Sequence, residues 1–360
     1  MKCDIMFLKV SKEVIMKFIH IADMHFDTPL LSLKNNRELI KKRRTEYKQV
    51  FRDVIQLCKK EEVELLFVSG DLFEHKFVQR GTIEFIISSF QLIPNTKIFI
   101  APGNHDPYIK SSPYTTYEWP ENVTIFTDKI GMFSVGNVNI YGIGFNNFEF
   151  MSDEISKIEM EDNNKINIFV AHGTLNGSSK KYLDIKSKDV EKFDYVALGH
   201  IHEKKVDDSH LIYPGSLVSM GFDELGEHGL VIGNLEKNNI TYEFRNMENR
   251  HFIEYQVDIS DFKSPDEILN HVTFEDNFYR VILSGSRNVS IEKVKEILNE
   301  QSKNICDIKD LTHIAYDFEK IATEQNLKGY FTKKMLEEMK QHPEQKEEIL
   351  HSLEITYQLM

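Results

Sequence analysis

The sequence predicts an α/β fold in which two β-sheets pack face to face between layers of helices. In the first third of the chain, apolar runs typical of buried strands alternate with segments of helical periodicity. From residue 123 onward, short strand-like runs bounded by Gly and Asn predominate. Five of the strand-like runs end in side chains that can bind metals. Because open sheets place their ligands at the carboxyl ends of strands, we expect a metal site at that edge.

The elements expected before residue 250 follow from these patterns. Helices are expected over residues 39–58 and 81–90, and strands over residues 18–22, 64–68, 97–101, 123–126, 138–142, 166–170, 195–198, 211–213, 229–235 and 240–245. Apolar residues of the first helix recur every three or four positions, which predicts one buried face. Its opposite face is either a solvated surface or a contact for a phosphate backbone. That face carries Lys41, Lys42, Arg43, Arg44, Lys48 and Arg52.

A domain boundary is expected near residues 246–250, where the strand-end motifs stop. We expect an N-terminal extension over residues 1–15, a large domain over 16–248, a small α+β domain over 249–315 and terminal helices over 316–360. An apolar stripe on the last helix either packs on its own domain or docks a partner. The stripe consists of Ile349, Leu350, Leu353, Tyr357 and Met360.

Composition limits the classes of function. The chain has 360 residues and a formal net charge of −13, which argues against binding nucleic acid by bulk electrostatics. Cys3, Cys58 and Cys306 are distant from one another and odd in number, so reduced thiols in a cytoplasmic protein are expected. No apolar segment approaches the roughly 20 residues that span a bilayer, so no membrane contact is expected. A phosphate-binding loop of ATPases is absent from the sequence.

Seven side chains at the strand ends are candidate metal ligands. They are Asp23, His25, Asp71, Asn104, His172, His200 and His202. Asp71 is the natural bridge between two ions, since its side chain is short and carries two oxygens. Asp23 and His25 can bind one ion together, and we expect His200 and His202 to be divided between the two. Mixed nitrogen and oxygen ligands without a thiolate favour two divalent ions, manganese (Mn2+) or iron, with zinc also compatible.

His105 follows Asn104 directly, so its ring is expected to face the substrate beside the metals. We expect it to stabilise the transition state or protonate the leaving oxygen, with Asp106 holding the ring in place. The alternative is that His105 is itself a metal ligand.

Four further residues are interpreted without a catalytic role. His20 is expected in the core, and Glu74 and His75 as solvated loop residues, although an outer-shell contact is the alternative. No general base stands at a spacing from Ser216 that is typical of a serine nucleophile, so we reject that chemistry.

Taken in order, the five strand-end motifs resemble the complete signature of the calcineurin-like metallophosphoesterases across residues 17–245. The motifs are Asp23-x-His25, Gly70-Asp71, Gly103-Asn104-His105-Asp106, His172 and Gly199-His200-x-His202. Residues 21–29, 70–73 and 213–217 resemble the DNA repair exonucleases of that superfamily, namely the nuclease subunit of SbcCD and its YhaO-like relatives. Glu74 stands where that branch often has aspartate. The domain after residue 250 resembles that branch's capping domain.

The resemblance implies a two-sheet αββα metallophosphoesterase sandwich and a manganese-dependent phosphodiesterase that acts on DNA as an exonuclease or endonuclease in repair. It also implies an SbcC-like coiled-coil ATPase partner, and a homodimer formed through helices of the nuclease domain. One ion would be bound by Asp23, His25, Asp71 and His202, and the other by Asp71, Asn104, His172 and His200.

In the mechanism expected from this resemblance, a metal-bound hydroxide attacks phosphorus in line while His105 assists the leaving oxygen. Two rival functions remain open: a phosphatase or phosphodiesterase on a substrate other than DNA, and a non-catalytic scaffold subunit of an ATPase complex.

Overall fold

The computed structural model describes residues 15–178, 181–206, 209–248, 250–314 and 316–359. The expected N-terminal extension therefore lies outside the described residues except for Ile15. The chain divides into two compact units. The first contains the residues up to Ile253 together with Asp276–Phe278, and the second contains Glu254–Glu275 and the residues from Tyr279 onward.

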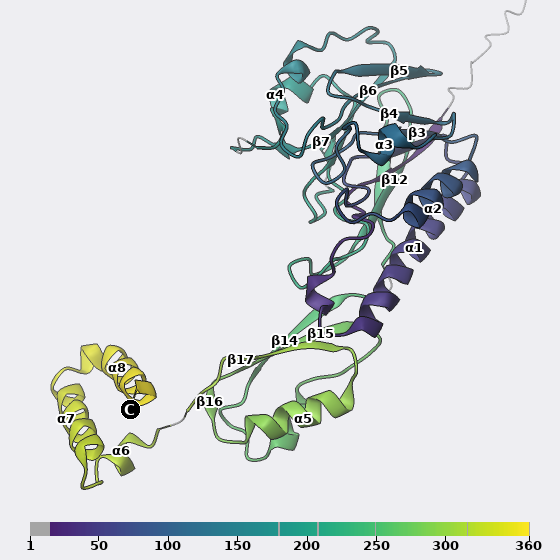
Figure 1. The fold of residues 1–360 in the computed structure, drawn as a ribbon. Helices are drawn as coiled ribbons and strands as arrows, with labels where there is room; N and C mark the ends of the chain where they lie inside the picture. Colours follow the sequence, from purple (N-terminus) through teal and green to yellow (C-terminus); the bar gives the residue numbers. More distant parts are fainter. Residues whose placement is uncertain (1–14, 179–180, 207–208, 249, 315, 360) are drawn as a thin grey trace, which may run out of the picture. The chain divides into compact units, whose positions relative to one another are not determined.

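Two β-sheets build the first unit, as predicted (Figure 1). The six-stranded sheet has the order β13 (Thr241–Asn246), β12 (Gly229–Leu235), β1 (Met16–Ile21), β2 (Leu65–Val68), β3 (Lys97–Ile100) and β4 (Val123–Ile125). The five-stranded sheet has the order β11 (Leu211–Ile212), β10 (Tyr195–Gly199), β7 (Ile166–His172), β6 (Val138–Ile143) and β5 (Gly131–Val135). Strands β1 to β4 are parallel, as are β6, β7, β10 and β11, so their carboxyl ends meet at one edge of each sheet.

The main core lies between the two sheets. Phe18 and Phe67 of the first sheet and Ile168 and Tyr195 of the second belong to one buried cluster. Alternate residues of the same strands face outward and are buried by a second layer, such as Phe169 on the side of η2 (Glu154–Lys157) and α4 (Ser187–Val190). Strands buried on both faces read as continuous apolar runs, which explains why the sequence indicated them.

Helices α1 (Arg37–Lys60) and α2 (Arg80–Gln91) run beside one another along the six-stranded sheet (Figure 1). The side chain of Asn36 caps α1 by accepting hydrogen bonds from the backbone N–H groups of Glu38 and Leu39. That cap makes α1 begin two residues before the expected start. Before α1 the chain forms a short 3₁₀ turn, η1 (Leu31–Leu33). Shorter elements are α3 (Pro113–Thr116), β8 (Thr174–Leu175) and β9 (Asp184–Ile185).

The second unit begins with a three-stranded sheet and its own core. The sheet has the order β14 (Phe252–Asp258), β15 (Phe278–Ser284) and β17 (Ile305–Asp310). Val281 and Leu283 of β15 pack with Ile268 and Leu298 from η3 (Pro265–Asn270) and α5 (Ile291–Gln301). A smaller pair of strands comprises β16 (Ser286–Arg287) and β18 (His313–Ile314). The sequence predicts strands over residues 251–258, 278–284 and 304–311 and helices over 265–272 and 291–301. These elements are present, except that residues 265–270 form a 3₁₀ helix. The short pair of strands was not predicted.

The C-terminal segment is helical, with α6 (Phe318–Ile321), α7 (Leu327–Gln341), η4 (Pro343–Gln345) and α8 (Lys346–Leu359). Ile349, Leu353 and Tyr357 of the expected stripe are buried against apolar residues of the stretch 316–339. This part of the stripe therefore packs within its own segment, while Met360 lies outside the described residues.

Within the described ranges, no helix is long and apolar enough to cross a bilayer. Cys58 is a buried free thiol, and Cys3 lies outside the described residues.

Arg43 is not on the solvated face of α1, which corrects the expectation. Its side chain is 1% exposed and forms a buried ion pair with Glu248. Arg43 also donates hydrogen bonds to the carbonyl oxygens of Ser219, at 2.7 Å, and Arg250, at 3.3 Å. Ser219, Glu248 and Arg250 cover this turn of the helix, and helical periodicity cannot reveal such long-range partners.

The buried pair predicts a stability effect. Replacing Arg43 with Met leaves Glu248 without its cation in a dry site, so the free energy of unfolding should fall by about 3–5 kcal/mol at pH 7. Chemical denaturation monitored by circular dichroism measures this. Arg44→Met is the matched control, because Arg44 is exposed, and it should change stability by less than about 0.5 kcal/mol. Equal stability of the two variants would contradict the account.

The same pair has a pH signature. Burial raises the pKa of Glu248, but the adjacent His251, 3.3 Å away, and the charge of Arg43 outweigh burial and lower it from 4.5 to about 2. A depressed folded-state pKa adds stability that is fully present above 4.5 and is lost as the pH falls toward 2.

Candidate metal centre

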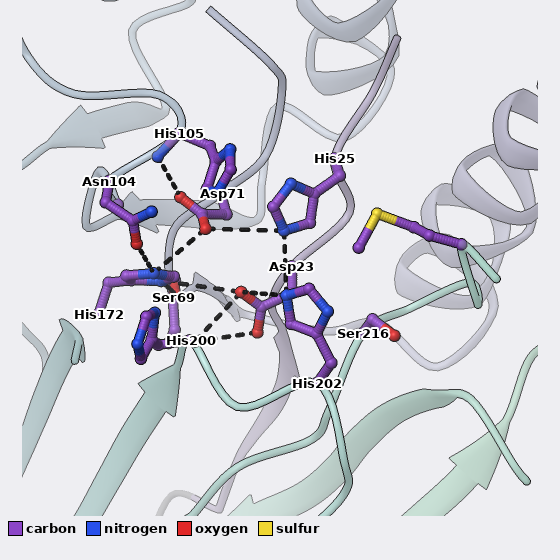
Figure 2. Close-up of polar contacts among 12 residues, drawn as sticks. Asp23, His25, Ser69, Asp71, Asn104, His105, His172, His200, His202 and Ser216 are labelled. Carbon is purple, nitrogen blue, oxygen red and sulfur yellow. Dashed lines mark hydrogen bonds and ion pairs between the residues drawn. The ribbon is translucent and has the colours of Figure 1, made fainter. Parts of the chain in front are cut away.

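Five strand ends bring the predicted metal ligands together (Figure 2). Asp23 and His25 follow β1, Asp71 follows β2, and Asn104 follows β3 of the first sheet. From the second sheet, His172 is the last residue of β7, and His200 and His202 follow β10. Since the carboxyl ends of both sets of parallel strands converge here, residues as distant along the chain as His25 and His202 come into contact.

The ligand turns adopt a backbone conformation that is unusual for residues with side chains. Asp23, His25, Asp71 and His200 have φ values of 50°, 47°, 50° and 100°. Backbone hydrogen bonds between the β1 and β2 turns hold this geometry, from Asp23 N to Gly70 O at 3.1 Å and from His25 N to Asp71 O at 2.8 Å. Such strain in several neighbouring turns is typical of functional sites.

A first group of acceptor atoms lies around His25 and His202. Their Nε2 atoms are 3.2 Å apart, while each Nδ1 faces a carboxylate, that of Glu74 at 2.8 Å and that of Glu224 at 2.6 Å. With a proton on each Nδ1, the two neutral rings direct lone pairs at one another. Asp71 Oδ2 lies 3.6 Å from His25 Nε2, and Asp23 Oδ1 lies 4.0 Å from His202 Nε2. Four acceptors in this arrangement require a proton or a cation among them.

A second group contains His172. Its Nδ1 lies 2.9 Å from the carbonyl oxygen of Ser69, which fixes the proton there and directs the Nε2 lone pair inward. That Nε2 lies 3.1 Å from Asn104 Oδ1 and 3.3 Å from Asp71 Oδ2. The same Asp71 oxygen therefore borders both groups of acceptors.

The ring of His200 lies beside the second group. Its centroid lies 5.1 Å from that of His172 and 4.8 Å from that of Tyr182. Its backbone N–H donates to both carboxylate oxygens of Asp23, at 3.1 and 3.0 Å. The described residues contain three groups of His, Asp or Glu side chains with ligand atoms within 4.8 Å of one another, and His200 is in none of them. Those groups are Asp23–His25–His202, His25–Asp71–His105 and Asp23–Asp71–His172.

The electrostatics of this donor set favour a cation. Burial by itself raises the pKa of the Asp71 carboxyl, but the adjacent His172 and His25 hold it well below its usual range. Burial lowers the pKa of His172 and His202, yet Asp71 beside the first and Glu224 beside the second raise both to about 9. Crowded acceptors attract protons for the same reason that they attract metal ions. The His and Asp side chains are thus placed to bind metal.

Glu74 is part of this centre, although it was expected to be solvated. It is 9% exposed, and its two carboxylate oxygens lie 2.8 Å from His25 Nδ1 and 2.9 Å from His105 Nδ1. Its position three residues after Asp71, where the resembled branch often has aspartate, was the signal that could have found it. Glu74 orients one predicted ligand and the predicted catalytic histidine together.

Asp106 does not hold the ring of His105, contrary to the expectation. Its carboxylate accepts hydrogen bonds from the backbone N–H groups of Asp71, Leu72 and Gly103 and from the hydroxyl of Tyr114. Burial and the nearby Asp71 charge raise the pKa of Asp106 to about 6. Asp106 thus fixes the backbone of two ligand turns rather than a reacting group.

The other candidates have structural roles. His20 is fully buried and contacts the Tyr195 hydroxyl at 3.1 Å and Ser69 Oγ at 2.9 Å, so it is the expected core histidine. Ser216 is buried and donates to Glu224 Oε2 at 3.0 Å. Glu224 itself was missed, because it lies in a loop 22 residues after His202 without any strand signal.

Gly103 packs so closely against Asp71 that adding a side chain at this position should disturb the metal centre. A Cβ atom there would lie 2.3 Å from Asp71 Oδ1, so Gly103→Ala must displace the shared carboxylate. We expect metal affinity to fall by about 10–100-fold, measured by titration with Mn2+. Gly81→Ala is the control, because a Cβ at this helical position meets nothing within 4 Å. Unchanged affinity in Gly103→Ala would show that Asp71 is not a ligand.

Glu74→Gln tests the shared orientation of the two rings. An amide can accept from only one ring nitrogen through its oxygen and presents a donor to the other. We expect a loss of about 10–100-fold in metal affinity or turnover. Glu84→Gln on the exposed side of α2 should leave both unchanged. If the two variants behave alike, the contacts of Glu74 do not matter for the centre.

Comparison with known proteins gives an independent view of this centre. Residues 16–204 match the family described as calcineurin-like phosphoesterase, which is more than half of the chain. The "Uncharacterized metallophosphoesterase YhaO" of Bacillus subtilis is 28% identical over 286 residues, covering 75% of this chain and 69% of that protein.

Two nuclease subunits of SbcCD are also similar. That of Staphylococcus saprophyticus is 25% identical over 264 residues, covering 64% of this chain and 68% of that protein. Its counterpart in Staphylococcus epidermidis is 26% identical over 278 residues, covering 63% and 68%. The extent of the family match, on a two-sheet fold with His and Asp side chains gathered at the strand ends, means that this chain belongs to the calcineurin-like phosphoesterase family.

Proposed function

We propose that this protein is a two-metal phosphodiesterase that cleaves DNA with manganese as its cofactor. The observation that carries the proposal is the pair of acceptor groups that share Asp71 Oδ2, one around His25 and His202 and the other around His172. Two such groups with one common carboxylate fit a dinuclear centre, in which ions are typically about 3.5–4 Å apart.

One ion would be held by Asp23, His25, Asp71 and His202, and the other by Asp71, Asn104, His172 and His200. Nitrogen and oxygen donors without a thiolate suit manganese or iron, and also zinc. When bound, two such ions supply Lewis acidity and neutralise the charge of a phosphate. The protein's own contribution is to keep the histidine Nε2 atoms directed at the centre through Glu74, Glu224 and the Ser69 carbonyl.

His105 is proposed as the residue that handles the substrate. Its side chain is 45% exposed, and its Nδ1 is bound to Glu74, which leaves Nε2 for a phosphate oxygen or the leaving oxygen. Burial lowers the pKa of His105, but the hydrogen bond to Glu74 and the charges of Asp71 and Glu74 together outweigh burial and raise it. A protonated ring can then donate to the leaving oxygen.

A nucleic acid substrate is supported by the names of the two staphylococcal nuclease subunits. DNA as that substrate and a role in repair are proposed from the resemblance of residues 21–29, 70–73 and 213–217 to the repair exonucleases. Because those relatives are subunits of a complex, we also propose an SbcC-like coiled-coil ATPase as partner. A homodimer through helices of the first unit remains part of the proposal. So does the division of the chain into a nuclease domain at 16–248, a capping domain at 249–315 and C-terminal helices at 316–360 that could dock a partner.

Cleavage of end-labelled duplex and single-stranded DNA with Mn2+ tests this function. The wild type should degrade DNA, and His105→Ala should lower the rate by about 10²–10⁴-fold while still binding metal. His313→Ala is the control, since His313 is exposed and lies in the second unit. Turnover of a phosphate monoester alone would refute DNA as the substrate. If metal-loaded protein hydrolyses neither ester, the assay is repeated with the ATPase partner, and continued inactivity would favour a scaffold.

A further inference from the structure

Five cations line one side of α1. Arg37, Lys41, Arg44, Lys48 and Arg52 are three or four positions apart, which places them along one edge of the helix. These five residues are called the basic stripe. From Arg37 to Arg52 the helix rises by 15 steps of ~1.5 Å, about 22 Å in all, so the stripe is a row of charge rather than a single cluster.

The stripe lacks carboxylate partners. In the ranges that the structure describes, none of its five members forms an ion pair, whereas the neighbouring Lys42 and Arg43 both do. The chain has 57 acidic and 44 basic residues, so acids were available to neutralise the stripe. Like charges three or four positions apart on a helix repel one another at a cost of a few tenths of a kcal/mol per pair. An unneutralised row in an acidic protein therefore points to an anionic partner.

Lys48 and Arg52 of the stripe are held in place by contacts that leave N–H groups available for a ligand. Phe85 of α2 lies under both, with its ring centroid 5.5 Å from Lys48 Nζ and 5.1 Å from Arg52 Cζ. A cation over an aromatic face keeps most of its N–H groups directed outward, in contrast to one in a salt bridge. The five side chains, with Ile40 and Thr45, line one shallow groove along α1.

The stripe also borders the turn that follows the predicted ligand His25. Arg44 and Lys48 line a small hollow together with Phe26, Asp27 and Thr28. These three residues directly follow His25, and all of them belong to the first unit. A long anion in the groove of α1 would therefore pass the turn that carries Asp23 and His25.

We propose that the basic stripe binds the phosphate backbone of DNA beyond the scissile bond, an inference that rests on the proposed function. A phosphate follows every ~3.4 Å along one strand, so a row of about 22 Å can meet several successive phosphates. A small anion needs a convergent pocket instead. Because Lys and Arg read phosphates rather than bases in such a contact, the stripe would add affinity without sequence preference.

The test compares two triple variants in a binding assay. Lys41→Gln/Arg44→Gln/Lys48→Gln removes three charges from the stripe. The matched control, Lys59→Gln/Lys60→Gln/Lys97→Gln, removes three exposed charges elsewhere in the same unit. Fluorescence anisotropy with a labelled 30-base-pair duplex is recorded in EDTA across a range of salt concentrations, so no hydrolysis occurs.

We expect the stripe variant to bind at least tenfold more weakly than the wild type. The slope of log K against log salt should fall by about 2–3, since each phosphate contact contributes roughly 0.9. The control should keep the wild-type affinity and slope. Equal binding by the stripe variant and the wild type would overturn the inference, as would equal losses in both triple variants. Wild-type binding to phosphatidylserine vesicles but not to DNA would overturn it too.

Failure of this inference differs from failure of the proposed function. If the wild type cleaves DNA with Mn2+ but the stripe variant binds normally, only the role of the stripe is wrong. If the wild type cleaves no phosphodiester, the proposed function fails whatever the stripe variant does.

Discussion

The carboxylate of Asp71 is the point on which the whole centre depends. It is 1% exposed, and one of its oxygens lies within 3.6 Å of His25 Nε2 and within 3.3 Å of His172 Nε2. Buried acceptors that face one another without donors are costly unless a positive charge lies among them. The parallel strands bring these atoms together, and a cation bound among them relieves the repulsion between their lone pairs.

Orientation comes from a second layer of acceptors. Glu74, Glu224 and the carbonyl oxygen of Ser69 each bind the Nδ1 of a histidine, and in each case the Nε2 lone pair faces the centre. Asp106 performs a related task for the backbone, because it ties the N–H groups of Gly103 and Asp71 into one network. Strand ends thus set the positions of the ligands, while loop carboxylates set the direction of their lone pairs.

The sequence predicted the features that follow from local pattern. Apolar runs indicated the strands on either side of the core, and the polar residue after each run indicated a ligand such as Asp71 or His172. Residues whose partners are distant could not be predicted in this way. Arg43 looked solvated because nothing in α1 reveals Glu248, 205 positions away. For the same reason, the contact with His105 was predicted for Asp106 but is made by Glu74. Both residues follow predicted ligands, and only the loop conformation decides which of them reaches His105.

A crystal structure grown with Mn2+ and recorded at the manganese absorption edge tests the central claim most directly. The account predicts two anomalous peaks roughly 3.5–4 Å apart, both within bonding distance of Asp71. One peak would take its other ligands from the side of His25 and His202, and the second from the side of His172 and Asn104. A single peak, or a second peak that does not contact Asp71, would contradict the claim that this carboxylate joins two metal sites.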